Sequence, residues 1–305
     1  MATSVTLQRR SVLLQAVRSF FLSRRYLEVD TPVLLPLLIP ESQIVPFCCE
    51  GRFLQTSPEL CMKHLLARGC PRLFQLCHCF RRGESGRYHL PEFTMLEWYH
   101  AGWSYLELMA EVEELVRTLA GNPDDFPGLD RQGNLVREQR TVALHRPWSR
   151  MTVDAAFLEF AGIPAREALA DGRFDEILVT EVEPNLGWEQ PLFLYDYPVT
   201  LGSLARPKKD DPSLAERFEL YICGIELGNG FSELVDPEEQ RRRFEREIAM
   251  MTGRERQVVM PERFLASLAA MPETAGIALG FDRLLMLFSG AGTISEVVPL
   301  AAEEL

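Results

Sequence analysis

The chain has 305 residues, of which 47% are hydrophobic and 25% are charged, a composition that excludes a disordered chain, a fibre and a small disulfide-linked scaffold. Its net charge of −12 gives no diffuse attraction to nucleic acid or anionic lipid. No apolar run approaches the roughly 18 residues of a membrane span, and the N-terminus lacks the apolar core of a signal peptide, so we expect a cytoplasmic protein without a membrane partner.

Two helices are predicted in the first 70 residues. The first covers residues 7–25, where apolar residues recur at the spacing of one helical face: Leu7, Leu14, Val17 and Phe21. The prolines that follow at positions 32 and 36 predict extended chain. A second helix is expected to have Ser57 as its N-cap and Pro58 as its first residue, and to end at Gly69.

An antiparallel hairpin is predicted next, because two β-rich runs at residues 72–82 and 92–99 flank a polar segment long enough to be a functional loop. Ser104 and Glu107 form a capping box for a helix that ends near Gly121. Residues 122–205 give weaker signals, and we interpret them as an insertion or connector.

The last third of the chain again gives strong signals. A long β-run, RFELYICGIELGNGFSEL, starts near residue 216. Asp236, Pro237 and Glu239 are then the cap, first residue and box partner of a helix that extends to about Gly253. A final strand turns at Gly280 into an apolar helix. We therefore expect an α+β fold in a single domain over residues 1–305.

Cysteine and lysine are distributed unevenly. Six of the seven cysteines lie between residues 48 and 79, but their CC and CxC spacings favour reduced, buried thiols over a zinc site. Only three of the 32 basic residues are lysines, and none follows a glycine in a phosphate-loop motif. Arginine is therefore expected to hold any bound phosphate.

Polar side chains alternate along the predicted strands, so they share one face of the sheet. The hairpin places the following residues there: Gln75, Cys77, Cys79, Arg81, Phe93, Met95, Glu97 and Tyr99. The third run adds Asn229, Phe231 and Glu233, with glycines at 228 and 230 that permit close approach of a ligand or a bend of the backbone. A solvated polar face is the alternative interpretation of each single residue.

Charged residues suggest two ligands. Glu219 and Glu226 could meet at Mg²⁺, and Arg283 lies in the first turn of a helix, where a polyphosphate is favoured. Exposed glutamates and a surface ion pair are the alternatives. The carboxylates of Glu59, Glu97 and Glu233 suggest a cationic substrate, because a buried carboxylate needs a partner charge. The residues together predict a site for ATP, Mg²⁺ and an amine.

Three segments resemble the signatures of class II aminoacyl-tRNA synthetases: YLEVDTPVL after a helix, FRRGESGRYHLPEF, and GIALGFDRLLML. Further segments resemble the lysyl-tRNA synthetase branch: TSPELCMKHLL, PEFTMLEWY and ELGNGFSELVD. The resemblance implies an antiparallel sheet of six or seven strands flanked by helices, in a homodimer formed through the first signature.

Lysyl-tRNA synthetases carry an anticodon-binding OB domain before this core, whereas here the first signature helix begins within ten residues of Met1. The chain thus resembles the truncated paralogues that attach a lysine-type group to a lysine of elongation factor P, and no OB domain and no tRNA partner are expected. Ala278, where the synthetases are expected to have glycine, favours a β-amino acid. Both α-lysine and (R)-β-lysine remain open as substrates.

The resemblance also implies roles for individual residues. Arg81 and Arg283 would be catalytic, at the α-phosphate and the γ-phosphate, and Glu219 and Glu226 would bind Mg²⁺. The implied ATP site contains Arg81, Glu84, His89, Phe93, Glu226, Leu227, Gly280 and Arg283. The implied substrate site contains Ser57, Glu59, Glu97, Tyr99, Asn229, Phe231, Glu233 and Ala278. The chain departs from the family pattern at Gly83, where a glutamate is expected, and at Leu90, where an asparagine is expected.

The implied reaction has two steps: formation of an aminoacyl-adenylate from the amino acid and ATP, then acylation of a lysine on elongation factor P. Three alternatives are weighed. The first is a regulatory module that binds an amino acid or adenylate, which Gly83 and Leu90 would favour. The second is an asparagine synthetase-like ligase, against which Glu97 and Glu233 argue. The third is a lysyl-tRNA synthetase whose tRNA-binding part is supplied by another chain.

Overall fold

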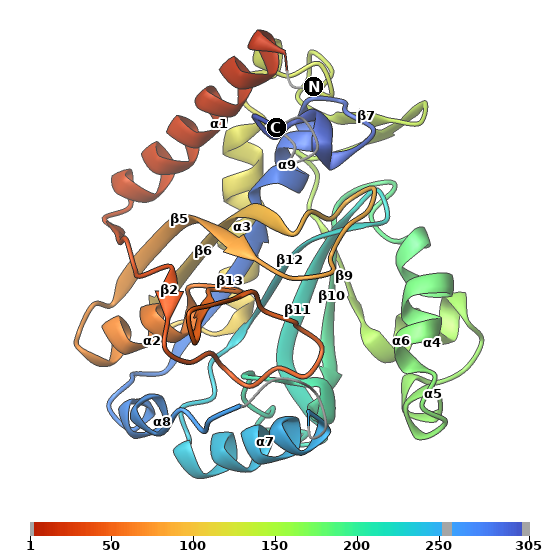
Figure 1. Cartoon of the computed structure of the whole chain (residues 1–305). Coiled ribbons are helices and arrows are strands. Elements are labelled where there is room, and N and C mark those ends of the chain that lie inside the picture. Colours follow the sequence, from red (N-terminus) through yellow and green to blue (C-terminus); the bar gives the residue numbers. More distant parts are fainter. Residues whose placement is uncertain (1–2, 252–257, 301–305) are drawn as a thin grey trace.

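A mixed sheet of eight strands organises the fold, in the order β1-β5-β6-β13-β12-β11-β10-β9 (Figure 1). The computed structural model describes residues 3–251 and 258–300. In sheet order the strands are β1 (Leu27–Glu28), β5 (Arg72–Phe80), β6 (Glu92–Ala101), β13 (Thr274–Gly280), β12 (Ile225–Ser232), β11 (Leu214–Ile222), β10 (Leu192–Pro198) and β9 (Ser149–Thr152).

The expected antiparallel sheet is confirmed for its six central strands, and the strand number is corrected to eight. The two edge strands β1 and β9 are parallel to their neighbours β5 and β10. Strand β1 is only two residues long and follows directly on the first helix, which is why no separate strand signal is visible in the sequence there.

Helices cover the two faces of the sheet (Figure 1). Helices α1 (Ser4–Ser23), α3 (Tyr105–Leu119) and α9 (Phe281–Phe288) pack on the face that carries Phe74 and Trp98. Helices α2 (Glu59–Ala67), α7 (Pro237–Met250) and α8 (Glu262–Leu268) contribute to the core on the face of Leu73 and Tyr99. Because side chains alternate along a strand, one hairpin serves both cores.

The buried face of α1 differs from the predicted one. Leu7 is 42% exposed, whereas Leu13, Val17, Phe20 and Phe21 are buried against the sheet. The buried side of the first turns of α1 is that of Thr6 and Arg10, so Leu7 lies on the uncovered side of the helix.

The smaller elements lie beside this sheet. They are a three-stranded sheet of β2 (Leu34–Leu35), β4 (Arg52–Leu54) and β3 (Cys48–Cys49), the hairpin β7 (Leu135–Arg137) with β8 (Arg140–Val142), and the short helices α4 (Val153–Phe160), α5 (Ala165–Ala170) and α6 (Phe174–Ile177). A π-helix, η2 (Leu178–Val182), follows α6, and the 3₁₀ turns are η1 (Pro123–Asp125), η3 (Glu183–Asn185), η4 (Val199–Leu201) and η5 (Ile294–Glu296). Strands β9 and β10 come from the stretch predicted as an insertion, yet they extend the main sheet.

The long β-run near residue 216 is two strands, not one. Cys223 and Gly224 have φ values of 56° and 69°, and they connect β11 to β12 in an antiparallel hairpin. Two successive residues with positive φ are typical of a type I′ turn, whose twist matches that of the flanking strands. The apolar residues on both sides of this turn concealed it in the sequence.

The predicted helix starts are confirmed with small differences. The capping box of Ser104 and Glu107 is present, and the Asp236 side chain accepts hydrogen bonds from two backbone N–H groups of α7. The side chain of the expected box partner Glu239 instead pairs with Arg242 and Arg243. The predicted end of that helix at Gly253 lies outside the described residues.

The second predicted helix, α2, begins one residue later than expected, at Glu59, with Pro58 in the N-cap position. The Ser57 hydroxyl still accepts a hydrogen bond from the Glu59 backbone N–H at 2.9 Å. Gly69 follows this helix with a φ of 93°, as expected for a glycine at a helix end.

All seven cysteines are free thiols. Of the six cysteines predicted to be buried, Cys79 is buried and Cys61, Cys70 and Cys77 are partly buried. Cys48 and Cys49 are exposed because they form an outer strand of the small sheet. Within residues 3–251 and 258–300, no three or more Cys, His, Asp or Glu side chains are arranged to hold a metal ion. The same residues contain no helix long and apolar enough to span a bilayer.

Candidate active site

Strand register gathers most of the predicted substrate residues into two rows across one face of the sheet. The first row joins Gln75, Glu97, Ala278, Asn229 and Glu219 on five adjacent strands. The second row joins Leu73, Tyr99, Gly276, Phe231 and Arg217. Residues opposite each other on neighbouring strands have side chains on the same face, so segments far apart in the sequence form one surface.

A β-bulge brings Glu226 to this face. The register of β11 with β12 shifts so that Tyr221 is opposite Glu226 and Leu220 is opposite Gly228, which leaves Leu227 as the extra residue. In a regular strand Glu226 and Asn229 would point to opposite faces. The bulge reverses the alternation, so Glu226 shares a face with Asn229 while the Leu227 side chain packs in the core.

The substrate residues make a closely connected pocket. The Glu97 carboxylate accepts hydrogen bonds from the Ser57 hydroxyl at 2.9 Å and from the Tyr99 hydroxyl at 2.6 Å. Glu97 and Glu233 are each only 1% exposed. Helix α2 brings Glu59 to the same pocket. The structure thus brings together the three carboxylates predicted to hold ammonium groups.

Lys63 is a pocket residue that the sequence analysis missed. Its ammonium lies 2.5 Å from a Glu59 oxygen and 2.5 Å from a Glu233 oxygen, and 5.3 Å from the centre of the Phe231 ring. Its side chain is 1% exposed. One signal was available: a lysine four residues after Glu59 on a helix shares its face.

Gly276 is a second pocket residue that was missed. A Cβ atom at this position would lie 2.3 Å from the Tyr99 ring and 2.8 Å from a Glu233 oxygen. Side chains at such distances overlap, so the second row can bring Tyr99 and Glu233 together only where β13 has glycine. This requirement could not be predicted from the sequence, because it depends on cross-strand register.

Burial makes the pocket carboxylates resist ionisation. Removal from water raises the pKa of Glu97 to about 8, with a contribution from the nearby Glu59 charge. The pKa of Glu233 also rises to about 8, again mainly through burial, although Lys63 opposes the rise. Glu41, which was not predicted, has its pKa raised to about 7 by burial and by Glu59. The single Lys63 ammonium is therefore too little positive charge to keep all of these carboxyl groups ionised.

A buried amide adds to this pocket. Gln75 is 1% exposed, stands opposite Glu97 in the first row, and has no hydrogen-bond partner on either amide atom among the described residues. Buried polar groups are normally hydrogen-bonded, so Gln75 is available to a ligand on this face.

The predicted phosphate end lies around Arg283. Its guanidinium donates hydrogen bonds to the backbone oxygens of Tyr88 at 3.1 Å and Glu226 at 2.7 Å, and lies 2.7 Å from a ring nitrogen of His89. Burial and the Arg283 charge lower the pKa of His89, so its ring is neutral and can accept this hydrogen bond. The Arg283 side chain also packs beside Gly280.

Arg81, predicted to lie at the α-phosphate, is close to Phe93, which is predicted to stack under adenine. The Arg81 guanidinium lies 5.3 Å from the centre of the Phe93 ring. It also lies 3.8 Å from a Glu84 oxygen, and it donates a long hydrogen bond of 3.4 Å to the backbone oxygen of Thr56. These weak contacts leave the guanidinium free to bind an anion. Gly83 has a φ of 87°, so the chain turns sharply where the family pattern has a glutamate.

Buried contacts hold the segments of this end in place. Arg10 on α1 pairs with Asp282 at 2.6 Å and donates a hydrogen bond to the Thr94 hydroxyl at 2.7 Å. Asp282 precedes Arg283, and Thr94 follows Phe93. One buried arginine therefore connects both phosphate-site segments to the first helix.

Three carboxylates gather near the phosphate end. Glu219 accepts hydrogen bonds from the Tyr197 and Tyr221 hydroxyls at 2.5 and 2.7 Å, and Arg217 pairs with its other oxygen at 2.6 Å. The Tyr221 hydroxyl also contacts Glu183, a residue that was not predicted, at 3.0 Å. Burial raises the pKa of Glu183 to about 7, and the charges of Glu219 and Glu226 add to the rise.

These carboxylates fit the donor set of Mg²⁺. Hard oxygen ligands are what the ion prefers, and it is usually held by one or two carboxylates together with substrate phosphates. Glu226 is the more open of the predicted pair, with a side chain 38% exposed, while Glu219 is 9% exposed and already paired. The mutual repulsion that raises the pKa of Glu183 is what a cation at this place would relieve.

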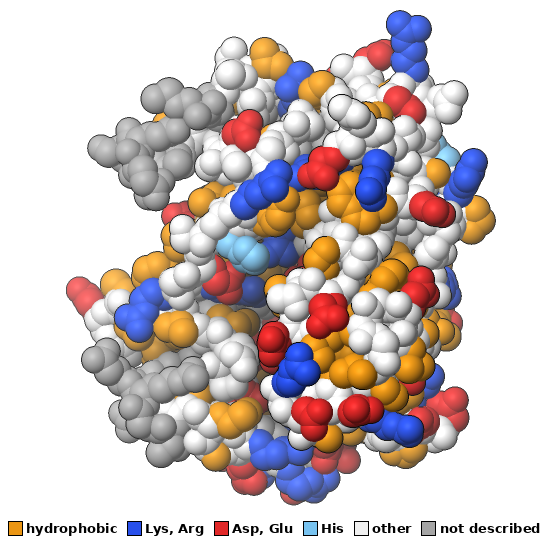
Figure 2. Space-filling model, turned by 90° about the vertical axis from the view of Figure 1, so that its right-hand side faces the viewer, with side chains coloured by type: hydrophobic (Ala, Val, Ile, Leu, Met, Phe, Trp, Pro, Cys, Tyr) orange, Lys and Arg blue, Asp and Glu red, His pale blue; other side chains and the backbone are white. Residues whose placement is uncertain are grey.

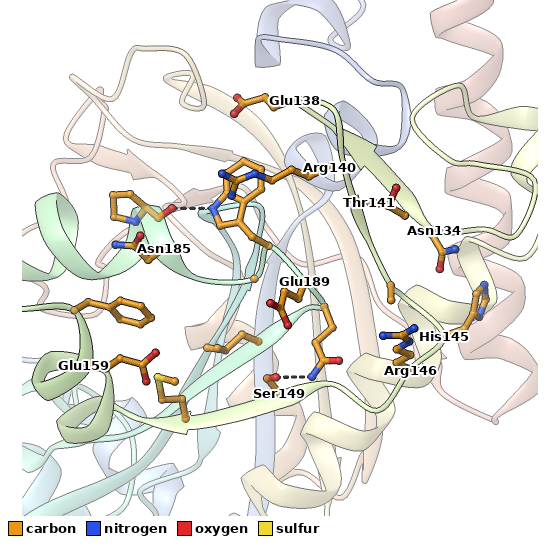
Figure 3. A pocket seen from close by; sticks show the side chains of 18 of the residues that line it. Asn134, Glu138, Arg140, Thr141, His145, Arg146, Ser149, Glu159, Asn185 and Glu189 are labelled. Atoms are coloured by element: carbon orange, nitrogen blue, oxygen red, sulfur yellow. Dashed lines mark hydrogen bonds between the residues drawn. The ribbon is translucent and has the colours of Figure 1, made fainter.

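A separate cavity lies outside this site. It has a volume of about 1380 Å³ between the β7–β8 hairpin, β9 and the segment 184–190, and none of the predicted site residues lines it (Figure 3). Arg140 lies over the Trp188 ring at 4.8 Å, and the ring nitrogen donates a hydrogen bond to the Pro184 oxygen. Acidic and basic side chains alternate around its wall, which favours no single ligand charge.

The face shown in Figure 2 also mixes acidic and basic side chains and has no broad basic patch.

The family model of class II tRNA synthetases (D, K and N) matches residues 2–304. A relative in Pectobacterium carotovorum subsp. carotovorum (strain PC1), named elongation factor P–(R)-β-lysine ligase, is 38% identical over 322 residues, which cover 99% of this chain and 96% of the relative. The chain therefore belongs to the class II tRNA synthetase family of the D, K and N group.

Proposed function

We propose that this protein is an ATP-dependent ligase that activates lysine or (R)-β-lysine and transfers it to a lysine side chain of elongation factor P. The observation that carries the proposal is the cluster of three carboxylates, the buried Glu97 and Glu233 and the partly buried Glu59, beside the arginine-rich end of the same sheet face. Buried carboxylates in excess of cations select an amine. The name of the Pectobacterium relative supports both the amino acid and the acceptor.

In the first step the substrate carboxylate attacks the α-phosphorus of ATP, a P–O bond forms, and the bond to pyrophosphate breaks with the electron pair leaving on pyrophosphate. Arg81 would neutralise the α-phosphate and the attacking carboxylate, and Arg283 with His89 would hold the γ-phosphate. Such positioning and charge stabilisation account for most catalysis of phosphoryl and nucleotidyl transfer.

Mg²⁺ would be held by Glu226 and Glu219, with Glu183 close by, and when bound it would neutralise charge on the phosphate oxygens. The protein's own contribution at this place is to hold the carboxylates through Tyr197, Tyr221 and Arg217. Phe93 would stack under adenine, and the backbone near Leu227 and Gly280 would line the nucleotide.

In the second step the neutral ε-amine of the acceptor lysine attacks the carbonyl carbon of the adenylate. A C–N bond forms, the bond to AMP breaks, and the amine loses a proton to water or to the released phosphate oxygen. The protein needs no side-chain nucleophile for this step.

The substrate pocket would hold the two ammonium groups through its three carboxylates, with Ser57, Tyr99 and Asn229 orienting them. Ala278 lies between Glu97 and Asn229 in the first row. The substrate has two amines, one of them nearer its carboxylate. The Ala278 methyl group narrows the space around the carbon that bears this nearer amine. We propose that this favours the β-amino isomer.

We further propose a homodimer formed through α1 and the strands after it. Large apolar side chains are exposed along this segment: Val5, Leu7, Val12, Leu22, Leu27, Val33 and Leu34. Strand β1 is also the edge of the main sheet. A concentration of exposed large apolar side chains along one segment is what a contact with another protein surface would use.

The proposal is tested by incubating the protein with elongation factor P, ATP and each lysine isomer, then measuring the intact mass of the acceptor. We expect an added mass of one lysyl group that depends on ATP and is absent with the Arg81→Ala variant. An unmodified acceptor together with charged tRNA would identify a lysyl-tRNA synthetase instead.

A regulatory module that binds an adenylate without turnover is the second candidate, because Gly83 places no side chain where the family pattern has a glutamate. This candidate predicts binding of ATP and lysine with no release of pyrophosphate. The proposed ligase predicts release of one pyrophosphate for each group transferred.

A further inference from the structure

Lys63 is the cation around which the substrate pocket is built. It lies on α2, and its side chain is 1% exposed, compared with 14% for Glu59 and 0% for Glu233. Its two partners come from different elements, Glu59 from its own helix and Glu233 from the chain after β12. Both oxygens lie 2.5 Å from the same nitrogen, so the two carboxylates can be no more than about 5 Å apart at these atoms and would repel each other without it.

The charges in the pocket can be counted. Glu59, Glu97 and Glu233 are three carboxylates, and Lys63 is the cation that contacts two of them. Glu41 is a further carboxylate nearby, and Arg81 and Lys63 both favour its charged form. Arg81 and Glu41 carry opposite charges that cancel in the count, so once Glu59, Glu97 and Glu233 are ionised the pocket is short of two positive charges. A diamino acid with two protonated amines supplies two.

We propose that Lys63 is a positioning residue that sets the specificity of this pocket: its ammonium holds Glu59 and Glu233 together and fixes at two the number of substrate ammonium groups that the pocket neutralises. This inference rests on the proposed function, because it assumes that the pocket binds the amino acid. It assigns to Lys63 no contact with the reacting atoms.

The alternative is that Lys63 is only a structural ion-pair partner. A double-mutant cycle separates the two, because residues that act through a shared charge are coupled whereas independent structural losses add. Lys63→Met removes one positive charge from the pocket, and Glu59→Gln removes one negative charge. In the double variant the carboxylates of the pocket again outnumber its cations by two, as in the unchanged protein.

The experiment measures the KM for lysine and for 6-hydroxynorleucine, which has one ammonium fewer, in lysine-dependent exchange of pyrophosphate into ATP. We expect Lys63→Met to raise the lysine KM by about tenfold or more, as for truncation of one partner of a buried charge pair. The KM for ATP should stay within about twofold. The double variant should bind lysine better than Lys63→Met alone.

Two control variants accompany the cycle. Lys208→Met breaks another lysine pair, with Asp196 at 2.6 Å, and should leave the lysine KM within about twofold. Lys63→Arg keeps the charge and should retain a lower lysine KM than Lys63→Met. Calorimetric measurement of lysine binding, which needs no turnover, should place the variants in the same order of affinity for lysine.

The results have distinct meanings. A double variant whose loss equals or exceeds the sum of the single losses, or a rise in the ATP KM equal to that for lysine, would overturn the role of Lys63. If the unchanged protein exchanges pyrophosphate with no lysine isomer, the proposed function itself fails. If Lys63→Met does not fold, the KM values for lysine of Lys63→Arg, the double variant and the unchanged protein are compared instead. Their order still decides whether Lys63 has the proposed role.

Discussion

The two ends of the site contain the same number of carboxylates but different numbers of cations. The substrate pocket has three carboxylates around one ammonium, whereas at the phosphate end Glu183, Glu219 and Glu226 lie beside Arg217 and Arg283. Burial also differs, since Glu233 has a fully buried side chain and that of Glu226 is 38% exposed. The pocket therefore has too few positive charges for its carboxylates, while the phosphate end has arginines that can bind an anion.

This difference predicts that damage to one end leaves binding at the other end intact. The strongest case is Gly276→Ala, because the added Cβ would overlap the Tyr99 ring and approach Glu233. We expect lysine-dependent pyrophosphate exchange to fall by more than about 100-fold, while calorimetric ATP binding persists. Gly292→Ala, which meets only an ordinary contact at 3.5 Å, is the matched control. Normal lysine activation by Gly276→Ala would refute the close packing of the second row.

The phosphate end should respond in the opposite way to Arg283→Met. This change removes the guanidinium that contacts Tyr88, His89 and Glu226. We expect a loss of about 100-fold in exchange, as for loss of one preorganised charge at a transferring phosphoryl group, with a raised KM for ATP. Lysine binding measured by calorimetry should be unchanged. Equal weakening of lysine binding would mean that the two ends are not separable.

The pH dependence of lysine binding should be steeper than that of ATP binding. Glu97 and Glu233 each have a pKa of about 8 in the empty pocket, and they must ionise to hold ammonium groups beside Lys63 and Glu59. Each carboxyl group that must lose a proton when lysine binds makes the affinity for lysine depend on pH. As the pH drops from 8 to 6, the affinity should fall by up to about tenfold per pH unit for each such proton. Calorimetry in buffers of different ionisation enthalpy should show proton release on binding. A flat profile would contradict the charge deficit.

The same groups affect stability with a defined sign. The folded pKa values of about 8 exceed the ordinary glutamate pKa of 4.5, so the folded chain binds more protons than the unfolded chain between these two pH values. Stability contributed by Glu97 and Glu233 is therefore complete below about pH 4.5 and is lost as the pH rises through about 8. Lysine should raise the melting temperature more at pH 8 than at pH 6.

The smallest expected effect is at Ala278, between Glu97 and Asn229. Removal of its methyl group in Ala278→Gly should shift the ratio of kcat/KM values toward α-lysine by about tenfold, which corresponds to about 1.4 kcal/mol. The KM for ATP serves as the internal control. An unchanged ratio would remove Ala278 as the basis for choosing between the isomers.

Local patterns were enough to predict the elements of the core. The capping box at Ser104, the hairpin of β5 with β6 and the strand-to-helix turn at Gly280 all depend on residues that are close in sequence. The predicted substrate face also followed from simple alternation on β6, because that strand is regular over its whole length.

Features that depend on long-range register could not be predicted. The bulge at Leu227 decides the face of Glu226; the neighbouring Gly228 permits a bend of the backbone but does not indicate the register shift itself, which depends on the pairing with β11. Glu183 reaches the site through Tyr221 from the end of a helical segment, and Gly276 matters only because Tyr99 lies opposite it. Lys63 was overlooked because a lysine on a short helix is usually exposed; its burial follows from Glu233, which is 170 residues later in the chain.

The central claim is that the pocket delivers a lysine-type amino acid to ATP at the arginine end. It is tested most directly by amino-acid-dependent exchange of labelled pyrophosphate into ATP with α-lysine and (R)-β-lysine in parallel. We expect at least one isomer to support exchange, 6-hydroxynorleucine to support far less, and Arg81→Ala to abolish it. Exchange with neither isomer, or exchange unaffected by Arg81→Ala, would contradict the account.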